Sequence, residues 1–208
     1  MTRNQHPIVA AEGVPFLLLN GFVLVAVFHW FGWILALAPL FSLLALVLLF
    51  RDPARDVPAA PLDVLSPCDG TVLSVEPTDR GVLEREALRL VIRVNNFGAY
   101  TARSPIEGKV LDPRDNVRAG SRLLGINGLW VRSEALDDII TLFRGPRYIG
   151  APAGFIRYGE RIGQGQRCAY LRLARQAAVL IPANATPLVK KGDRVIAGKT
   201  ALARLRSD

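Results

Sequence analysis

Apolar residues are concentrated in one uninterrupted segment near the start of the chain. No charged residue occurs between Val14 and Phe50. A helix needs about 20 apolar residues to cross the ~30 Å hydrocarbon core of a bilayer, so this segment is nearly twice as long as one span requires. Aromatic residues and Gly32 lie at its middle, where a turn at the lipid–water interface would need them. The pattern predicts a membrane hairpin over residues 14–50, with helices roughly at 14–30 and 33–50.

Arginines on both sides of this segment predict its orientation. Arg3 precedes it, and Arg51 and Arg55 follow it. Because positive charges beside a membrane segment favour the cytoplasmic side, we expect residues 1–13 and the main domain on the cytoplasmic face of a cell inner membrane. Two alternatives are open. One steeply tilted helix could span alone and place the rest of the chain outside, or the hairpin could lie shallowly in one leaflet.

The pattern changes sharply after residue 50. Residues 51–61 form a linker punctuated by three prolines, which is typical of stiff, non-helical chain. From residue 62 to 208, short runs of β-branched and aliphatic residues alternate with turn-forming residues, which favours a mainly β domain, a β-sandwich or hybrid barrel. Only the segment Cys168–Ala178 fits a helix as well as a strand.

One sequence pattern occurs twice in this domain. The motif S-P-x-[DE]-G-x-V-L begins at Ser66 and again at Ser104, and it predicts a proline-led turn followed by a strand. A further pattern, V-K-x-G-D-x-V-x-x-G-x-x-x-L over residues 189–202, resembles the corner of lipoyl- and biotinyl-type barrels. Those carriers place the modified lysine beside methionine, and the one methionine here is Met1. The pattern therefore indicates a fold and not a carrier.

Composition narrows the possible chemistry. The chain has 208 residues, with two cysteines and two histidines, and both histidines precede residue 50. The β domain therefore cannot hold a histidine-based metal site or a Ser-His-Asp arrangement, and we expect no metal. Arg3 and Glu12 cancel, so the formal net charge of +8 belongs to residues 51–208. Anionic phospholipid headgroups suit a basic domain attached to a membrane, and without a nucleic-acid motif we expect no nucleic acid.

Several motifs, taken in order, resemble the phosphatidylserine decarboxylase family of the short bacterial and archaeal type. After the apolar segment they are Phe50-Arg51-Asp52-Pro53, Ser66-Pro67-Cys68-Asp69-Gly70, Arg103-Ser104-Pro105-Ile106-Glu107-Gly108-Lys109-Val110, Gly159-Glu160-Arg161-Ile162-Gly163 and Val179-Leu180-Ile181-Pro182. The resemblance runs from about residue 13 to 205. It implies a proenzyme that cuts itself before the serine of a Gly-Ser pair. That serine becomes a pyruvoyl group, which binds the substrate amine and accepts electrons as carbon dioxide leaves.

The family's catalytic residues are only partly present. Its aspartate corresponds to Asp69, but its histidine falls on Tyr100, and its Gly-Ser pair falls on Ala174 and Arg175. Cys168 is the one alternative nucleophile nearby, and it has no histidine to activate it. The resemblance therefore implies a degenerate member that does not process itself, with no pyruvoyl cofactor and no catalytic residues.

The expected role is that of an inactive homologue. We expect it to bind anionic phospholipid through Arg103, Arg172 and Arg175, or to partner a membrane enzyme or a second copy of itself. An equally open interpretation is a filled-in site in which Arg175 pairs with Asp69. The alternatives from other classes are an active phosphatidylserine decarboxylase with atypical processing and a scaffold subunit of a membrane protein complex.

Overall fold

The computed structural model describes residues 9–78, 86–111, 128–145 and 153–206. The chain forms two compact units. The first, called the hairpin unit here, contains the chain up to Ala54 together with Phe97–Tyr100. The second, the β domain, contains Arg55–Asn96 and the chain from Thr101 onward. The segment 97–100, which the sequence analysis assigned to the β domain, groups instead with the hairpin.

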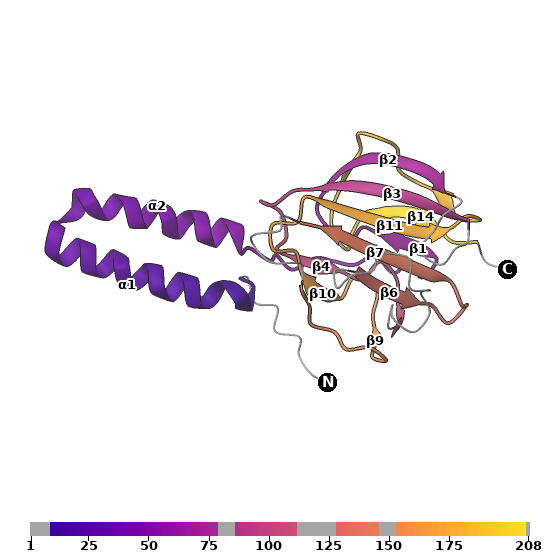
Figure 1. Ribbon diagram of the computed structural model, residues 1–208, viewed down its shortest axis with the longest axis horizontal. Coiled ribbons are helices and arrows are strands. Elements are labelled where there is room, and N and C mark those ends of the chain that lie inside the picture. The colour runs from indigo at the N-terminus through magenta and orange to yellow at the C-terminus, as the bar shows by residue number, and fades with distance from the viewer. Residues whose placement is uncertain (1–8, 79–85, 112–127, 146–152, 207–208) are drawn as a thin grey trace. The chain divides into compact units, whose positions relative to one another are not determined.

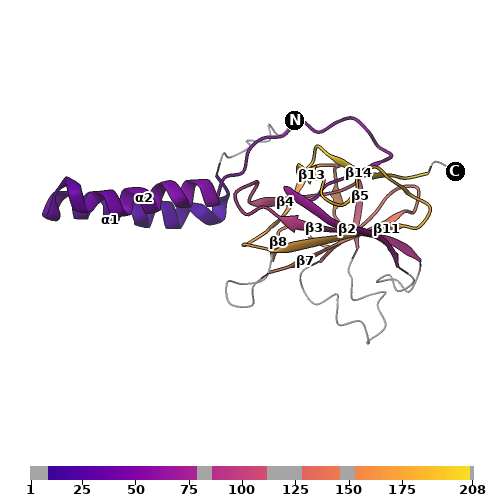
Figure 2. The same ribbon diagram turned by 90° about the horizontal axis from the view of Figure 1, so that it is seen from above.

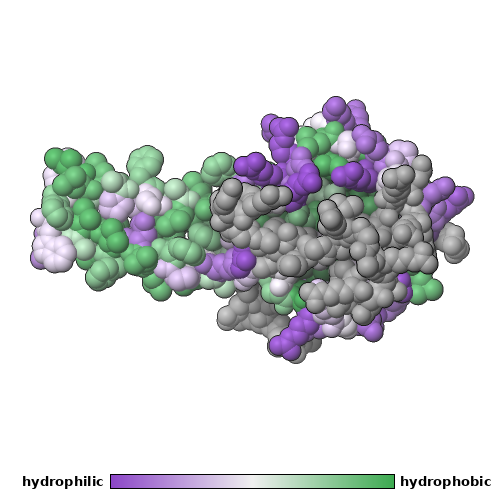
Figure 3. Space-filling view, in the orientation of Figure 1, coloured by the Kyte–Doolittle hydropathy of each residue, from purple (hydrophilic) through white to green (hydrophobic). Residues whose placement is uncertain are grey.

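Two helices form the hairpin, at the positions that the sequence predicts. A 3-10 turn, η1 (Ala11–Gly13), leads into α1 (Val14–Phe31), and α2 (Trp33–Leu49) returns beside it (Figure 1). Gly32 joins them with φ 82°, a conformation that glycine adopts without strain. Segment Ala11–Phe31 has the length and composition to cross a membrane, whereas α2 is shorter, at 17 residues. Apolar side chains cover the outer surface of both helices (Figure 3).

Polar and aromatic contacts fix the hairpin at two levels. Within it, Asn20 Nδ2 donates to Ser42 Oγ at 2.9 Å, which satisfies two polar groups on otherwise apolar helices. At its base, the Phe50 ring stacks on Phe16 and contacts Tyr100, with centroids 5.7 and 4.9 Å apart. The Tyr100 N–H also donates to the Arg51 carbonyl at 2.9 Å. These contacts explain why the segment 97–100 folds with the helices.

The β domain consists of antiparallel strands in three sheets (Figures 1 and 2). An eight-stranded sheet has the order β13-β2-β3-β11-β7-β6-β5-β9, and two three-stranded sheets have the orders β1-β14-β12 and β4-β10-β8. The strands are β1 (Asp63–Leu65), β2 (Gly70–Thr78), β3 (Ala87–Val94), β4 (Thr101–Arg103), β5 (Gly108–Leu111), β6 (Gly128–Arg132), β7 (Asp138–Arg144), β8 (Ala153–Gly154), β9 (Arg161–Ile162), β10 (Arg167–Tyr170), β11 (Gln176–Pro182), β12 (Thr186–Pro187), β13 (Arg194–Val195) and β14 (Ala201–Arg204). The mainly β fold is as predicted, and segment 168–178 is strand, not helix.

Alternating side chains of these strands build one main core. Val64 of β1, Leu90 and Ile92 of β3, and Val179 of β11 are fully buried in it together with Cys168 of β10. The three sheets thus bury their apolar faces against a shared interior, as strands with a two-residue side-chain period must.

The β domain is internally duplicated. Strands β4 to β10 form one half of the domain, and in the chain this half lies between β3 and β11 of the other half. The eight-stranded sheet contains four strands of one half followed by the equivalent four strands of the other half in reverse order. The two S-P-x-[DE]-G-x-V-L motifs bond to each other reciprocally: Leu65 N–H donates to Pro105 O at 2.8 Å, and Arg103 N–H donates to Pro67 O at 2.9 Å. The pseudo-twofold axis that relates the two halves therefore lies between the two motifs.

A second repeated motif completes each half. Residues 159–165 and 192–198 share the pattern G-[DE]-R-[VI]-x-x-G. Gly159 N–H donates to Val110 O, and Gly192 N–H donates to Val72 O, both at 2.8 Å. Each copy thereby adds a short strand, β9 or β13, beside the strand of the first motif. The sequence analysis treated these two segments as separate patterns and missed their equivalence.

We predict that replacing the glycine of either S-P-x-[DE]-G motif by alanine destabilises the β domain. A Cβ on Gly70 or Gly108 would lie 2.1 Å from the carbonyl oxygen of Arg93 or Arg132. Gly70→Ala and Gly108→Ala should each destabilise the domain by about 2 kcal/mol through forced strand displacement, which lowers the thermal midpoint by roughly 4–8 °C. Gly154→Ala is the control, because its nearest neighbour would be 3.9 Å away. Thermal unfolding of the detergent-solubilised chain measures this, and an unchanged midpoint in both variants would contradict it.

Candidate functional site

The positions matched to the family's catalytic aspartate and cleavage pair flank one end of β3. Asn95 N–H donates to Asp69 O at 2.8 Å, and Val94 N–H donates to Arg175 O at 3.0 Å. Asp69 and Arg175 are therefore two strand spacings apart, about 10 Å. Arg175 also ends the connection from β10 to β11, which rejoins the two halves of the domain.

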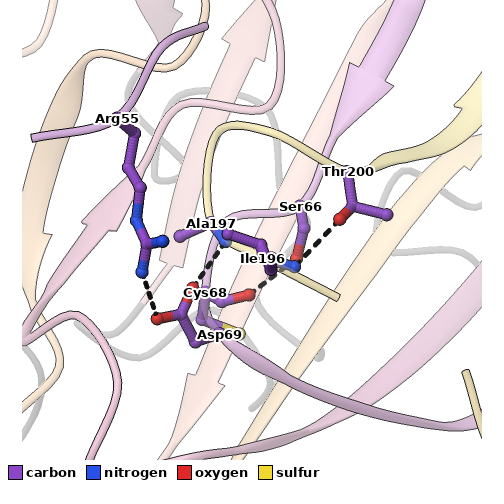
Figure 4. Close-up of polar contacts among 7 residues, drawn as sticks. All are labelled: Arg55, Ser66, Cys68, Asp69, Ile196, Ala197 and Thr200. Carbon is purple, nitrogen blue, oxygen red and sulfur yellow. Dashed lines mark hydrogen bonds and ion pairs between the residues drawn. The ribbon is translucent and has the colours of Figure 1, made fainter. Parts of the chain in front are cut away.

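Asp69 is buried and bound on both carboxylate oxygens. Its Oδ1 accepts the Ala197 N–H at 2.7 Å, and its Oδ2 pairs with Arg55 Nη2 at 2.8 Å (Figure 4). Arg55 comes from the linker and Ala197 from the second copy of G-[DE]-R-[VI]-x-x-G. Two local bonds hold these loops: Ser66 Oγ donates to Cys68 O, and the Ile196 N–H donates to Thr200 Oγ1. Glu107, the equivalent of Asp69 in the other half, is exposed.

The ion-pair partner of Asp69 thus differs from the filled-in interpretation given above. That interpretation paired Asp69 with Arg175, whereas the structure pairs it with Arg55. Sequence reasoning missed Arg55 and Ala197 because neither belongs to a motif with Asp69. Asp69 and Ala197 are 128 residues apart in the sequence, and they come into contact only when the strands of the duplicated domain pair.

A strained turn directly precedes Arg175 and ends at Ala174, the two residues matched to the family's cleavage pair. Arg172 and Leu173 have φ of 44° and 59°, and Ala174 N–H donates to Leu171 O at 2.9 Å, which is the pattern of a type I′ turn. Such turns favour Asn and Gly, because other side chains are strained at positive φ. Ala174 is fully buried, and Arg175 is exposed. The pairing of β10 and β11 with their neighbours holds this turn in place.

Cys168 is a core residue. It is 1% exposed, and its Sγ lies 3.3 Å from the Ala102 carbonyl oxygen. Burial raises the pKa of Cys168 to about 12, although the charge of Arg103 lowers it in part. Burial also raises the pKa of Cys68. A thiol with so high a pKa is almost entirely protonated at neutral pH, so Cys168 is poorly suited to act as a nucleophile.

The other predicted site residues lie in different surroundings. Arg103 is 3% exposed and donates from Nη1 to Gly165 O at 3.0 Å, and Arg172 is partly buried in the strained turn. Tyr100 belongs to the hairpin unit, where its hydroxyl bonds to Glu12 Oε2 at 3.1 Å. Arg103, Arg172 and Arg175 therefore do not form one exposed group, and their predicted role in lipid binding stays a prediction. Among the described residues, no cluster of His, Cys, Asp and Glu could hold a metal ion.

Several curated proteins are similar to this chain over nearly its whole length. No family model matches the chain. The chain is 33% identical to a protein of Nitrosomonas eutropha, with 97% of each chain covered, and 37% identical to one of Polynucleobacter asymbioticus, with 96% of each covered. It is 30% identical to a protein of Aromatoleum aromaticum, covering 99% of this chain and 100% of that one. All three are named phosphatidylserine decarboxylase proenzyme.

These relatives place the chain among proteins of phospholipid metabolism. It belongs to the phosphatidylserine decarboxylase family. Among solved structures, glucose permease IIA from Mycoplasma capricolum aligns with a TM-score of 0.48 and 15% identity, covering 68% of this chain and 94% of that chain.

We predict that both thiols resist alkylation in the folded protein. Because burial raises their pKa values, thiolate is scarce below about pH 12. Iodoacetamide at pH 8 should leave the native chain unmodified and label both cysteines after denaturation, as read by mass spectrometry. Labelling of Cys168 in the native chain at the rate of a free thiol would show that it is an accessible nucleophile.

We predict that Asp69 stabilises the fold and its pseudo-equivalent does not. Asp69→Ala leaves the Ala197 N–H and the Arg55 guanidinium without their acceptor, which should cost about 2 kcal/mol or more. Glu107→Ala, the matched control at the exposed equivalent, should change stability by about 0.5 kcal/mol or less. Denaturant unfolding of the two variants measures the difference, and equal effects would refute the structural role of Asp69.

Proposed function

We propose that this chain is a membrane-anchored member of the family that is not processed, and that it binds anionic phospholipid without decarboxylating it. The observation that carries the proposal is the pair Ala174–Arg175, which stands where the resemblance places the family's Gly-Ser pair. The pair directly follows the strained residues Arg172 and Leu173, in the connection from β10 to β11.

The residues at this position do not fit a self-generated pyruvoyl group. Self-cleavage needs a hydroxyl or thiol that attacks the preceding carbonyl, together with a base that takes its proton. Ala174 has no heteroatom in its side chain. Arg175 carries a guanidinium cation, which suits phosphate binding and is neither a hydroxyl or thiol nucleophile nor a base. Tyr100 stands where the family has histidine, and the carboxylate of Asp69 is bound by Arg55.

The hairpin unit supports attachment to a membrane. Helices α1 and α2 contain no charged residue, and the arginines Arg3, Arg51 and Arg55 flank them in the chain. By the positive-inside rule, we propose that both ends of the hairpin lie in the cytoplasm, at the inner membrane.

A second candidate is an active phosphatidylserine decarboxylase with atypical processing. It is favoured by the relatives, which are named proenzymes and match over nearly their whole length. It needs an internal nucleophile other than the expected serine. Cys168 is the nearest one to the expected position, and its burial and high pKa speak against it.

We predict one intact chain. The purified, detergent-solubilised protein should give a single species of 22.7 kDa under denaturing conditions, because no suitable nucleophile adjoins Arg175. The Nitrosomonas eutropha relative, produced in the same way, is the control and should give two fragments if it processes itself as its name states. Two fragments from this chain, the smaller with a blocked N-terminus, would overturn the proposal, and the cleavage position would identify the nucleophile.

A further inference from the structure

Three arginines stand in one row across the large sheet. In register, Arg194 of β13 lies opposite Thr71 of β2, which lies opposite Arg93 of β3. Gln176 of β11 continues the row from Arg93 to Arg144 of β7. Residues directly opposite each other on antiparallel strands share a face, so all five side chains lie on one face of the sheet. The three arginines, called the arginine row below, are exposed.

The duplicated half contains an equivalent row whose arginines are neutralised. There Arg161, Lys109 and Arg132 are aligned in the same way. Arg161 pairs with Glu134, and Arg132 pairs with Asp138, which stands in the row where the first half has Gln176. In the part of the chain that the structure describes, no carboxylate pairs with Arg93, Arg144 or Arg194. The two halves share a backbone pattern and differ in this charge balance.

The spacing of the arginine row suits several separate anions. Neighbouring strands are about 4.8 Å apart, so Arg93 lies about 10 Å from Arg144 and from Arg194. Within β2, the nearest carboxylate on the same face is that of Glu76. It lies opposite Arg89, which is four residues before Arg93 on β3. That is roughly 13 Å from the row, beyond the ~8 Å screening length at physiological salt. Two carboxylates lie nearer: Asp193, next to Arg194 in the chain, accepts the Lys190 N–H, and Asp69, two residues before Thr71, is bound by Arg55 and Ala197. The row therefore has a local excess of positive charge.

The row also lies at the end of β3 that leads into the hairpin unit. Arg93 is four residues before Phe97, the first residue of the segment that folds with the hairpin. Phe97 is itself 73% exposed, and aromatic side chains are enriched at membrane interfaces.

We propose that the arginine row binds the anionic headgroups of the bilayer in which the hairpin sits. This rests on the membrane attachment and lipid binding proposed above and names the surface responsible. It assigns the contact to the outer face of the sheet and not to the position of the lost cleavage pair. Each basic residue at an anionic surface contributes separately, so the affinity should fall stepwise as arginines are removed.

The test uses the full chain in detergent with equimolar phosphatidylglycerol and phosphatidylcholine, read by native mass spectrometry. Wild-type protein should retain phosphatidylglycerol in about fivefold or greater excess. Arg93→Gln/Arg144→Gln/Arg194→Gln should bring the ratio close to one, and single variants should lie between. The matched control, Lys109→Gln/Arg132→Gln/Arg161→Gln, removes the same number of cations from the equivalent row and should keep most of the preference.

Three results would overturn the assignment. They are an unchanged ratio in the arginine-row variant, an equal loss in both triple variants, and binding of a short DNA duplex through the row without lipid preference. Intact mass and thermal midpoint are measured on every preparation, so that misfolding and processing are seen independently. A cleaved chain with row-dependent lipid preference would refute the proposed lack of processing and leave the row standing. An intact chain whose lipid preference is the same with and without the arginine row would refute the role of the row and leave the proposed lack of processing standing.

Discussion

The reciprocal backbone bonds between the two S-P-x-[DE]-G motifs are the constraint on which the β domain depends. Leu65 bonds to Pro105 and Arg103 to Pro67, so neither half can close without the other. Each glycine lets a strand pass within contact of a neighbouring carbonyl, and each serine hydroxyl bonds to the carbonyl two residues ahead, both at 2.7 Å. Strand pairing of this kind is non-local, and the duplicated motifs supply the same geometry at both ends of the contact.

The insertion of one half into the other determines where the positions matched to the family's catalytic residues lie. The chain leaves the first half after Asn96 and returns at Arg175, and both connections adjoin the end of β3. One connection contains Tyr100 and folds with the helices, and the other contains the Ala174–Arg175 pair. A break in the second connection would separate the chain at a junction between halves that remain joined by strand pairing, since β11 pairs with both β3 and β7. After a break at that position, the pairing of β11 with β3 and β7 would still join the two halves.

The local pattern of apolar and polar residues was sufficient to predict the two helices of the hairpin and the mainly β class of the second unit. The absence of charge from Val14 to Phe50 and the turn at Gly32 predict both helices, because lipid-facing helices must be apolar on every side. Short runs between turn signals predict strands, but not their order. The ion pair of Asp69 with Arg55 and the alignment of Arg93 with Arg144 depend on register and on chain closure, and no spacing in the sequence encodes them. The equivalence of residues 159–165 and 192–198 was visible in the sequence, and the structure was needed to give it meaning.

Departures from the internal symmetry show which side-chain environments the shared backbone does not impose. A residue required by the fold should recur in both halves, as Ser66 and Ser104 or Gly70 and Gly108 do. Asp69 and Glu107 share a motif position, yet only Asp69 is buried and bound, so its environment is specific to one half. The arginine row differs from its equivalent in two ways: Gln176 stands in place of Asp138, and Arg194 has no counterpart of the Arg161–Glu134 ion pair among the described residues. Because the duplicated backbone imposes the same packing demands on both rows, packing alone does not explain why the arginines of one row have carboxylate partners and those of the other do not. Binding of an anionic ligand to the arginine row, as proposed above, would account for this difference.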